Sequence, residues 1–299
     1  MSRSSRAVLL CVLFILPLKA LAADGSATAQ WWADVSALAD DSMEGRLTGS
    51  PGYDRAAQYV ISRLKAEGLK PAGARGYLQP VTFEQQTVDQ GASHAELLAA
   101  DGAVTPLKVG DDMLITPGGS SRPPAVDAPL VFIGYGLHLP AQGYDDFAGQ
   151  DLKGKIAVVL GGGPDTISGP IKSDARSARN KALAKAGAIG VIALTTPKQV
   201  EIAWSRQKLI ARQPGMYLAD AGLRDTSDGF FTATFDPGQS ELLFKDSGHN
   251  FAELCTLSDT SKPVPRFALS LRLKAAIAAV RTPVSSPNIV ARLEGSDAR

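Results

Sequence analysis

The sequence predicts an α/β fold, and three features near its centre support that prediction. Two apolar runs of strand length, at 130–133 and 156–160, are each bounded by glycine and charged residues, as buried strands are. A helical pattern follows at 175–186, and Gly187 is placed to end that helix in the left-handed conformation. Another apolar run at 189–194 completes the order strand, strand, helix, strand.

The first 22 residues have the pattern of a secretory signal. Arg3 and Arg6 precede an apolar run at 7–18, and Ala20-Leu21-Ala22 forms a small-x-small cleavage site. A run of this length is too short to cross a bilayer, which needs about 20 apolar residues. We therefore expect a secreted or periplasmic protein with no membrane partner once the signal has been removed.

Charge and cysteine content narrow the functional classes. Of the 31 basic residues, Arg3, Arg6 and Lys19 lie in the signal, which leaves 28 against 30 acidic residues. Without a basic excess we expect no nucleic-acid partner. Cys255 is the only cysteine outside the signal, so an intramolecular disulfide is excluded. The mature chain is long enough to bury one large or two modest cores.

The segments on either side of the centre alternate between helical and strand patterns. An amphipathic helix is predicted at 31–38, and Ser50 and Pro51 are suitable N-cap and first residues for a second helix that ends at Gly68. Strands are predicted at 78–88, 230–235, 267–273 and 288–293, a hairpin at 95–107, and linkers at 113–126 and 282–287.

Two blocks of the sequence resemble a known family. Gly-Tyr-Gly at 134–136, Tyr-Asp-Asp at 144–146, the run 151–160 and the stretch 181–192 resemble a protease-associated domain. Met-Glu-Gly-Arg-Leu-Thr-Gly-Ser-Pro-Gly-Tyr at 43–53, with Gly-Leu-Lys-Pro-Ala-Gly at 68–73, resembles the first helices of the secreted zinc aminopeptidases that carry this domain as an insertion. These peptidases belong to the superfamily of glutamate carboxypeptidase and the transferrin receptor.

The resemblance implies a fold and a set of boundaries. A β-rich protease-associated domain at 126–281 would be inserted in an incomplete zinc-aminopeptidase-like α/β domain. The signal at 1–22 would precede an N-terminal peptidase segment at 23–125, and 282–299 would hold the returning strand of the truncated peptidase domain. An insertion leaves and re-enters its host at adjacent points, so strands 78–88 and 288–293 should be neighbours.

The sequence does not contain the ligands of a catalytic zinc centre. A two-zinc peptidase needs about five His, Asp and Glu ligands and a glutamate base. Only His94, His138 and His249 are present, none with an Asp two residues later. In the family the ligands follow a strand that resembles 286–295. We expect no metal ligand, catalytic residue or cofactor in this chain, whereas the full-length form would hold two zinc ions.

Three other patterns have ordinary structural interpretations. The glycines at 161–163 indicate an exit loop, because Pro164 interrupts them and no Lys-Ser/Thr follows. Two adjacent carboxylates at 145–146 are typical of solvated loop residues or cap residues rather than of a calcium site. Cys255 has no basic neighbour in sequence, so we expect a small core residue.

Arg176 is the predicted substrate-binding residue. Counted back from Gly187, it falls where related carboxypeptidases have an arginine that reaches from the inserted domain toward the substrate. A guanidinium there would pair in bidentate fashion with a peptide carboxylate. The alternative is a solvated arginine at the start of a helix, with its neighbour Arg179 equally placed.

The functional hypothesis is the non-catalytic N-terminal part of a secreted zinc-dependent aminopeptidase. The full-length form would bind peptide substrates and release their N-terminal residues, whereas this chain would be inactive alone. The alternative is a stand-alone protease-associated domain that binds peptides or proteins.

Overall fold

A computed structural model describes residues 25–116, 123–224 and 229–296. The predicted signal at 1–22 and part of the predicted linker, at 117–122, lie outside the described residues. The chain divides into two compact units. The helical unit consists of residues up to 78 and from 289 onward, and the sheet unit consists of 79–288. Of the helices in the described ranges, none has both the length and the hydropathy of a membrane-spanning segment.

The helical unit contains two α-helices, a short 3-10 helix and a small sheet. The Ser50 side chain accepts a hydrogen bond from the Tyr53 backbone N–H at 3.2 Å, which caps the second helix as predicted. The Asp34 carboxylate joins the two helices, because it accepts the Tyr59 hydroxyl at 2.6 Å and pairs with Arg63. The elements are α1 (Gly25–Ala39), η1 (Asp41–Arg46), α2 (Pro51–Ala66), β1 (Lys70–Pro71) and β15 (Ala291–Arg292).

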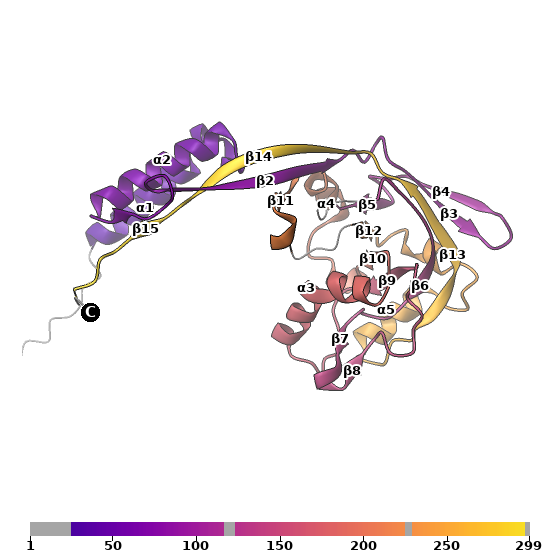
Figure 1. The fold of residues 1–299 in the computed structure, drawn as a ribbon. Helices are drawn as coiled ribbons and strands as arrows, with labels where there is room; N and C mark the ends of the chain where they lie inside the picture. Colours follow the sequence, from indigo (N-terminus) through magenta and orange to yellow (C-terminus); the bar gives the residue numbers. More distant parts are fainter. Residues whose placement is uncertain (1–24, 117–122, 225–228, 297–299) are drawn as a thin grey trace, which may run out of the picture. The chain divides into compact units, whose positions relative to one another are not determined.

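The sheet unit is built on a mixed sheet in which eight strands of the described residues pair in the order β4-β3-β13-β6-β9-β10-β12-β5 (Figure 1). Four neighbours, β6, β9, β10 and β12, run parallel, and the strands outside them are antiparallel. The strands are β3 (His94–Ala99), β4 (Val104–Leu107), β5 (Met113–Ile115), β6 (Ala125–Phe132), β9 (Ile156–Leu160), β10 (Gly190–Leu194), β12 (Phe231–Phe235) and β13 (Phe267–Ala276).

Helices connect the parallel strands, and smaller elements complete the unit. Helix α3 (Gly169–Lys185) joins β9 to β10, and α4 (Trp204–Ile210) belongs to the connection from β10 to β12. Helix α5 (Phe251–Asp259) precedes β13. Separate sheets are formed by β11 (Gly215–Leu218), β2 (Leu78–Val88) and β14 (Ala279–Ile289), and by β7 (His138–Leu139) with β8 (Tyr144–Asp145). The predicted α/β fold class is confirmed.

Both faces of the central strands are covered, which explains their continuous apolar runs. In β9, Ile156, Val158 and Leu160 point into one buried cluster that also contains Leu254 of α5. The alternate residues 157 and 159 belong to a second cluster, which Leu183 of α3 joins. Leu254 of α5 and Leu183 of α3 therefore cover opposite faces of β9, although Ala175 in the first half of α3 belongs to the cluster of Leu254.

The structure differs from the sequence-based prediction in both linkers. The first predicted linker begins with β5, a buried strand that pairs with β12. The second predicted linker lies inside β14, which contains Pro283 and Pro287. A proline lacks the N–H that a central strand needs, and β14 tolerates both because it is an edge strand, next to β2 alone.

The predicted pairing of 78–88 with 288–293 is confirmed only in part, because 288–289 end β14 beside β2, whereas 291–292 form β15 and pair with β1 in another sheet. Strand β2 lies between β11 and β14 in their three-stranded sheet. The pairing begins earlier than predicted, at Ala279, and Val290 N–H then donates to the Tyr77 carbonyl at 2.8 Å. The sheet unit starts at residue 79, whereas the sequence placed a domain boundary at 126, because β3, β4 and β5 join the same large sheet.

Candidate functional site

The candidate site lies at the carboxyl ends of β6 and β9, where open α/β sheets place their ligands. Two glycine-rich loops leave the sheet there, at 133–137 and 161–165. Gly136 has φ +65°, and a Cβ on it would lie 2.7 Å from Val159 Cγ1 and 3.0 Å from Arg179 Cδ. The absent side chain therefore allows the Arg179 stem of α3 to approach the loop backbone closely.

Three basic residues of α3 lie over these loops, and we call them the α3 cation row: Lys172, Arg176 and Arg179. Their spacing of four and three residues places them on one side of the helix. Lys172 Nζ donates to the Pro164 carbonyl at 3.2 Å. Arg176 Nη1 donates to the Gly162 carbonyl at 3.2 Å, and Arg179 Nη1 contacts the carbonyl of residue 135 at 3.5 Å.

The positive charge of this row is not neutralised by a carboxylate in the described part of the chain. The ion pairs found in the described ranges are formed by side chains other than Lys172, Arg176 and Arg179. Arg179 is half-buried, and its Nε atom has no hydrogen-bond partner among the described residues. Burial, followed by the charge of Arg176, lowers the pKa of Arg179 to about 10. Arg179 therefore remains charged at neutral pH, and the row is suited to an anion.

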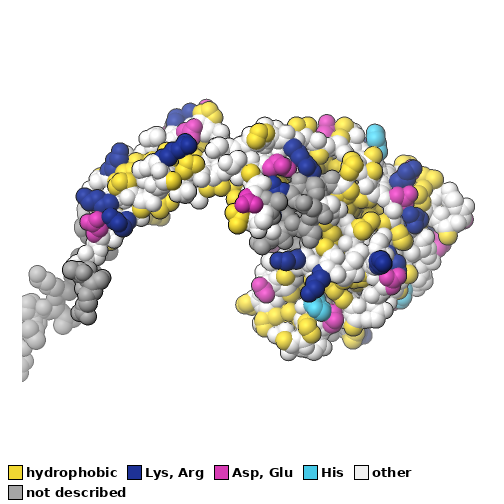
Figure 2. Space-filling view, in the orientation of Figure 1, with side chains coloured by type: hydrophobic (Ala, Val, Ile, Leu, Met, Phe, Trp, Pro, Cys, Tyr) yellow, Lys and Arg dark blue, Asp and Glu magenta, His cyan; other side chains and the backbone are white. Residues whose placement is uncertain are grey.

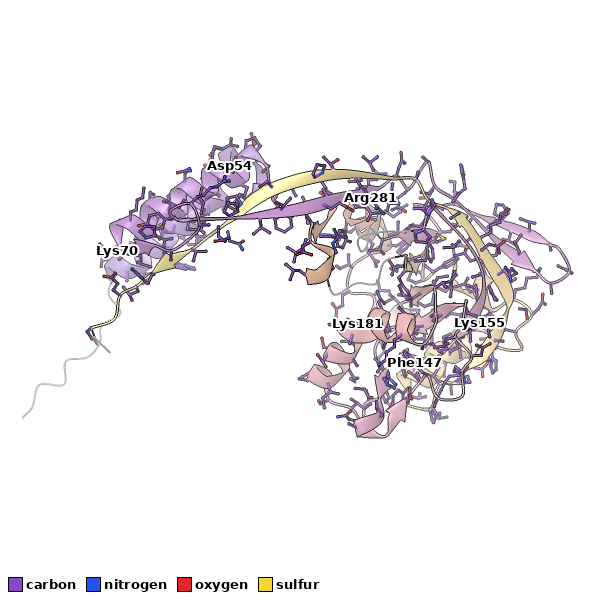
Figure 3. The ribbon with its side chains drawn as sticks, viewed as in Figure 1. Asp54, Lys70, Phe147, Lys155, Lys181 and Arg281 are labelled. Carbon is purple, nitrogen blue, oxygen red and sulfur yellow. The ribbon has the colours of Figure 1, made fainter. Side chains whose placement is uncertain are left out.

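Arg176 is exposed, whereas Arg179 is half-buried, so the two arginines are not equally placed. A guanidinium has five N–H donors, and Arg176 uses one of its own on Gly162. Figure 3 labels Lys181 on α3 and also Lys155, which precedes β9 and therefore lies at the opposite end of that strand from the two loops. Sequence reasoning identified Arg176 alone, although the spacing of Lys172 and Arg179 behind a glycine run was a usable signal for the whole row.

Asp146 holds the first glycine loop, at 133–137, in place through hydrogen bonds. Its side chain is fully buried and accepts hydrogen bonds from the Leu137 backbone N–H at 3.1 Å and from the Tyr144 hydroxyl at 2.9 Å. Arg266 Nε lies 3.6 Å from the same carboxylate. Burial raises the pKa of Asp146, and these contacts oppose the increase. The expectation of a solvated carboxylate is thus wrong for Asp146, because the loop encloses it.

The three histidines lie apart in ordinary environments. His138 pairs with Asp145 at 3.0 Å, His249 stacks on Phe267 at 4.1 Å between ring centroids, and His94 is exposed on β3. Within the described ranges there is no group of three or more His, Cys, Asp or Glu that could hold a metal ion. These residues therefore do not fit a two-zinc centre. On the face of the molecule that Figure 2 shows, acidic side chains (magenta) and basic side chains (dark blue) are interspersed.

Cys255 is a core residue rather than a nucleophile. Its side chain is buried, its thiol is free, and burial raises the pKa of that thiol to about 11. A thiol with such a pKa is almost entirely protonated at neutral pH, and the protonated form is not the nucleophile.

No family model matches the sequence, and no curated protein matches it. Two solved structures of peptidases are similar to the fold. One is an aminopeptidase from Aneurinibacillus sp. strain AM-1, with TM-score 0.37 and 18% identity over 89% of this chain and 51% of that chain. The other is the psychrophilic subtilisin-like protease Apa1 from Pseudoalteromonas sp. AS-11, with TM-score 0.29 and 14% identity over 66% and 36%. This chain thus spans about half the length of the aminopeptidase.

Proposed function

We propose that this chain is the non-catalytic front part of a secreted zinc-dependent aminopeptidase. The sheet unit would be its protease-associated domain, and the zinc ions and catalytic groups would come from further polypeptide. The observation that carries the proposal is the thin core of the helical unit. Among its described residues only Gly52, Ala56, Ala57 and Ile61 are buried.

Large apolar side chains of the helical unit are exposed instead. The exposed fractions are 61% for Trp31, 61% for Trp32 and 76% for Leu293. Covering each of these would contribute roughly 1.5–3 kcal/mol, which is large beside the 5–15 kcal/mol that typically separates folded from unfolded domains. A catalytic domain that packs on this unit would supply the missing cover.

Arg176 is proposed as the residue that receives a peptide carboxylate. It is exposed, its guanidinium has unused donors, and Arg179 beside it adds a second positive charge. A hydrogen bond to a charged group contributes about 1.5–3 kcal/mol. A peptide with a free carboxylate should therefore bind better than its amide.

Hydrogen exchange on the monomeric chain tests the thin core. Amides of α2 should exchange quickly, because few apolar contacts oppose local opening of this helix, whereas β9 and β10 should remain protected. The measurement is exchange followed by mass spectrometry of peptides from both units. Equal protection of α2 and β9 would show that the helical unit is stable on its own, and the proposal would fail.

Replacing Arg176 with alanine tests the carboxylate site. We expect the Kd for an N-acetyl dipeptide to increase roughly tenfold, which corresponds to about 1.4 kcal/mol. The Kd for the matching dipeptide amide should hardly change. An NMR titration measures both, and Arg206→Ala on α4 is the control for general loss of positive charge. Equal affinity of wild-type protein for acid and amide would contradict the assignment.

The second candidate is a stand-alone protein- or peptide-binding module. The observation in its favour is that the sheet unit buries both faces of its sheet with its own residues. The reading frame downstream separates the candidates. A continuation that contains His-x-Asp supports the peptidase, whereas a stop without such a continuation supports the binding module.

A further inference from the structure

A second pocket lies in the sheet unit, next to the glycine loop at 161–165, because Gln199 of its lining donates to the Gly161 carbonyl. Its volume is about 580 Å³, within the range of small-molecule sites. Leu114 of β5 and Thr234 of β12, which are paired in register, contribute to it together with Thr195 after β10. Ile210 of α4 and the turn at 199–202 line it from the other side.

The pocket exists because small side chains occupy this face of the sheet. In β12, Phe231, Ala233 and Phe235 are buried in the large cluster on the opposite face. The alternate position, Thr234, is half-buried and faces the pocket. Helix α4 has only seven residues, and its Ile210 remains 52% exposed. A threonine and a short helix leave a space that larger side chains would have filled.

The lining is mainly apolar. Val200 and Ile202 are 38% and 43% exposed, which is unusual for large aliphatic side chains that share one concave site with Ile210 and Leu114. A ligand that covers these side chains would remove apolar surface from water, which is favourable. The lining therefore selects a ligand with an alkyl or aromatic group.

The polar part of the described lining carries one formal charge, that of Glu201, among neutral amides and hydroxyls such as Gln207, whose Nε2 donates to the Ile202 carbonyl. Gln199 is half-buried, its Nε2 donates to the Gly161 carbonyl, and its Oε1 accepts no hydrogen bond from the described residues. The Gln199 amide packs against Gly161 and Gly162, where added Cβ atoms would lie 2.9 Å from its Oε1 and 2.5 Å from its Nε2. Glu201 is the one ionisable residue of the described lining, and no described cation pairs with it. The charge of Glu201 therefore favours an N–H donor over an acid.

We propose that this pocket binds a small ligand in which an apolar group is joined to an amine or amide N–H donor. The apolar group would cover Val200, Ile202 and Ile210, and the donor would pair with Glu201. A free alkylamine and the amino-terminal residue of an apolar peptide share this chemistry. The negative charge of Glu201 opposes an alkyl carboxylate of the same length.

The experiment uses N-phenyl-1-naphthylamine, a neutral aromatic probe with one N–H, whose fluorescence increases in an apolar site. Octylamine should displace the probe at about tenfold lower concentration than octanoate, because attraction to and repulsion by an exposed carboxylate each change affinity several-fold. Glu201→Gln should remove most of this preference and retain the probe. Equal displacement by octylamine and octanoate from the wild-type chain would overturn the proposal.

Two neighbouring substitutions locate the probe. Ile210→Asp should weaken probe binding about tenfold, because it places a charge in the apolar lining. Leu209→Asp is the matched control, because Leu209 is 60% exposed and is not part of the described lining. Similar losses in both variants, with unchanged circular dichroism, would refute this location. Leucyl-leucine amide distinguishes a peptide ligand from a free alkylamine. If it displaces the probe more strongly than octylamine does, the ligand is a peptide, and if it displaces the probe more weakly, the ligand is a free amine. Either result supports the proposal.

Discussion

Replacing Asp146 with alanine is expected to lower the free energy of unfolding of the sheet unit by about 3 kcal/mol at neutral pH. The substitution leaves two hydrogen-bond donors, the Leu137 N–H and the Tyr144 hydroxyl, without their acceptor. A buried polar group that loses its partner costs roughly 1–3 kcal/mol, so two such groups account for the expected loss. Urea denaturation followed by near-ultraviolet circular dichroism measures it.

The control for this substitution is Asp151→Ala. Asp151 is a surface carboxylate whose side chain is 73% exposed and pairs with Lys155, and exposed pairs contribute roughly 0–1 kcal/mol. If Asp146→Ala costs no more than Asp151→Ala, the Asp146 carboxylate does not hold the loop.

The loss on replacing Asp146 should also depend on pH. Burial raises the pKa of this carboxyl in the folded state above its value in the unfolded chain. Between the unfolded and folded pKa values the folded chain holds a proton that the unfolded chain has released, so the stability contributed by Asp146 decreases as pH rises through that window. The difference in unfolding free energy between wild type and Asp146→Ala should therefore be larger just below the unfolded pKa than at neutral pH.

Gly136→Ala is expected to destabilise the sheet unit by about 3 kcal/mol. The left-handed conformation at φ +65° costs an L-residue roughly 1–2 kcal/mol. The new Cβ would also lie 2.7 Å from Val159 Cγ1 and 3.0 Å from Arg179 Cδ, and such overpacking adds roughly 1–3 kcal/mol. The same denaturation experiment measures the effect.

Gly143→Ala separates the two causes. Gly143 has nearly the same backbone angle, φ +66°. Apart from its two chain neighbours, however, no described residue would have an atom within 4 Å of a Cβ on Gly143. It should therefore show the backbone cost alone. Equal destabilisation by Gly136→Ala and Gly143→Ala would mean that α3 does not approach the loop at Gly136 as closely as the structure indicates.

The candidate site was predictable only in part. Arg176 was proposed from the family resemblance, which places it by its distance from Gly187, and its role stays a prediction. The different environments of Arg176 and Arg179 were not predictable, because they depend on how two loops from separate strands pass beneath α3. The burial of Asp146 likewise depends on a loop that folds over it and on Arg266, 120 residues further along the chain.

The sequence by itself determined the central elements of the fold. Strands β9 and β10 and the last three residues of β6 are buried on both faces, so they require unbroken apolar runs, which can be recognised in the sequence. The edge strands β5 and β14 could be assigned only from the tertiary structure. Three residues of β5 are too few to show a period, and the prolines of β14 indicate a linker unless the strand is known to pair on one side only. The pocket lined by Leu114, Thr234 and Ile210 also depends on tertiary structure, because Leu114 and Thr234 become neighbours only when β5 pairs with β12.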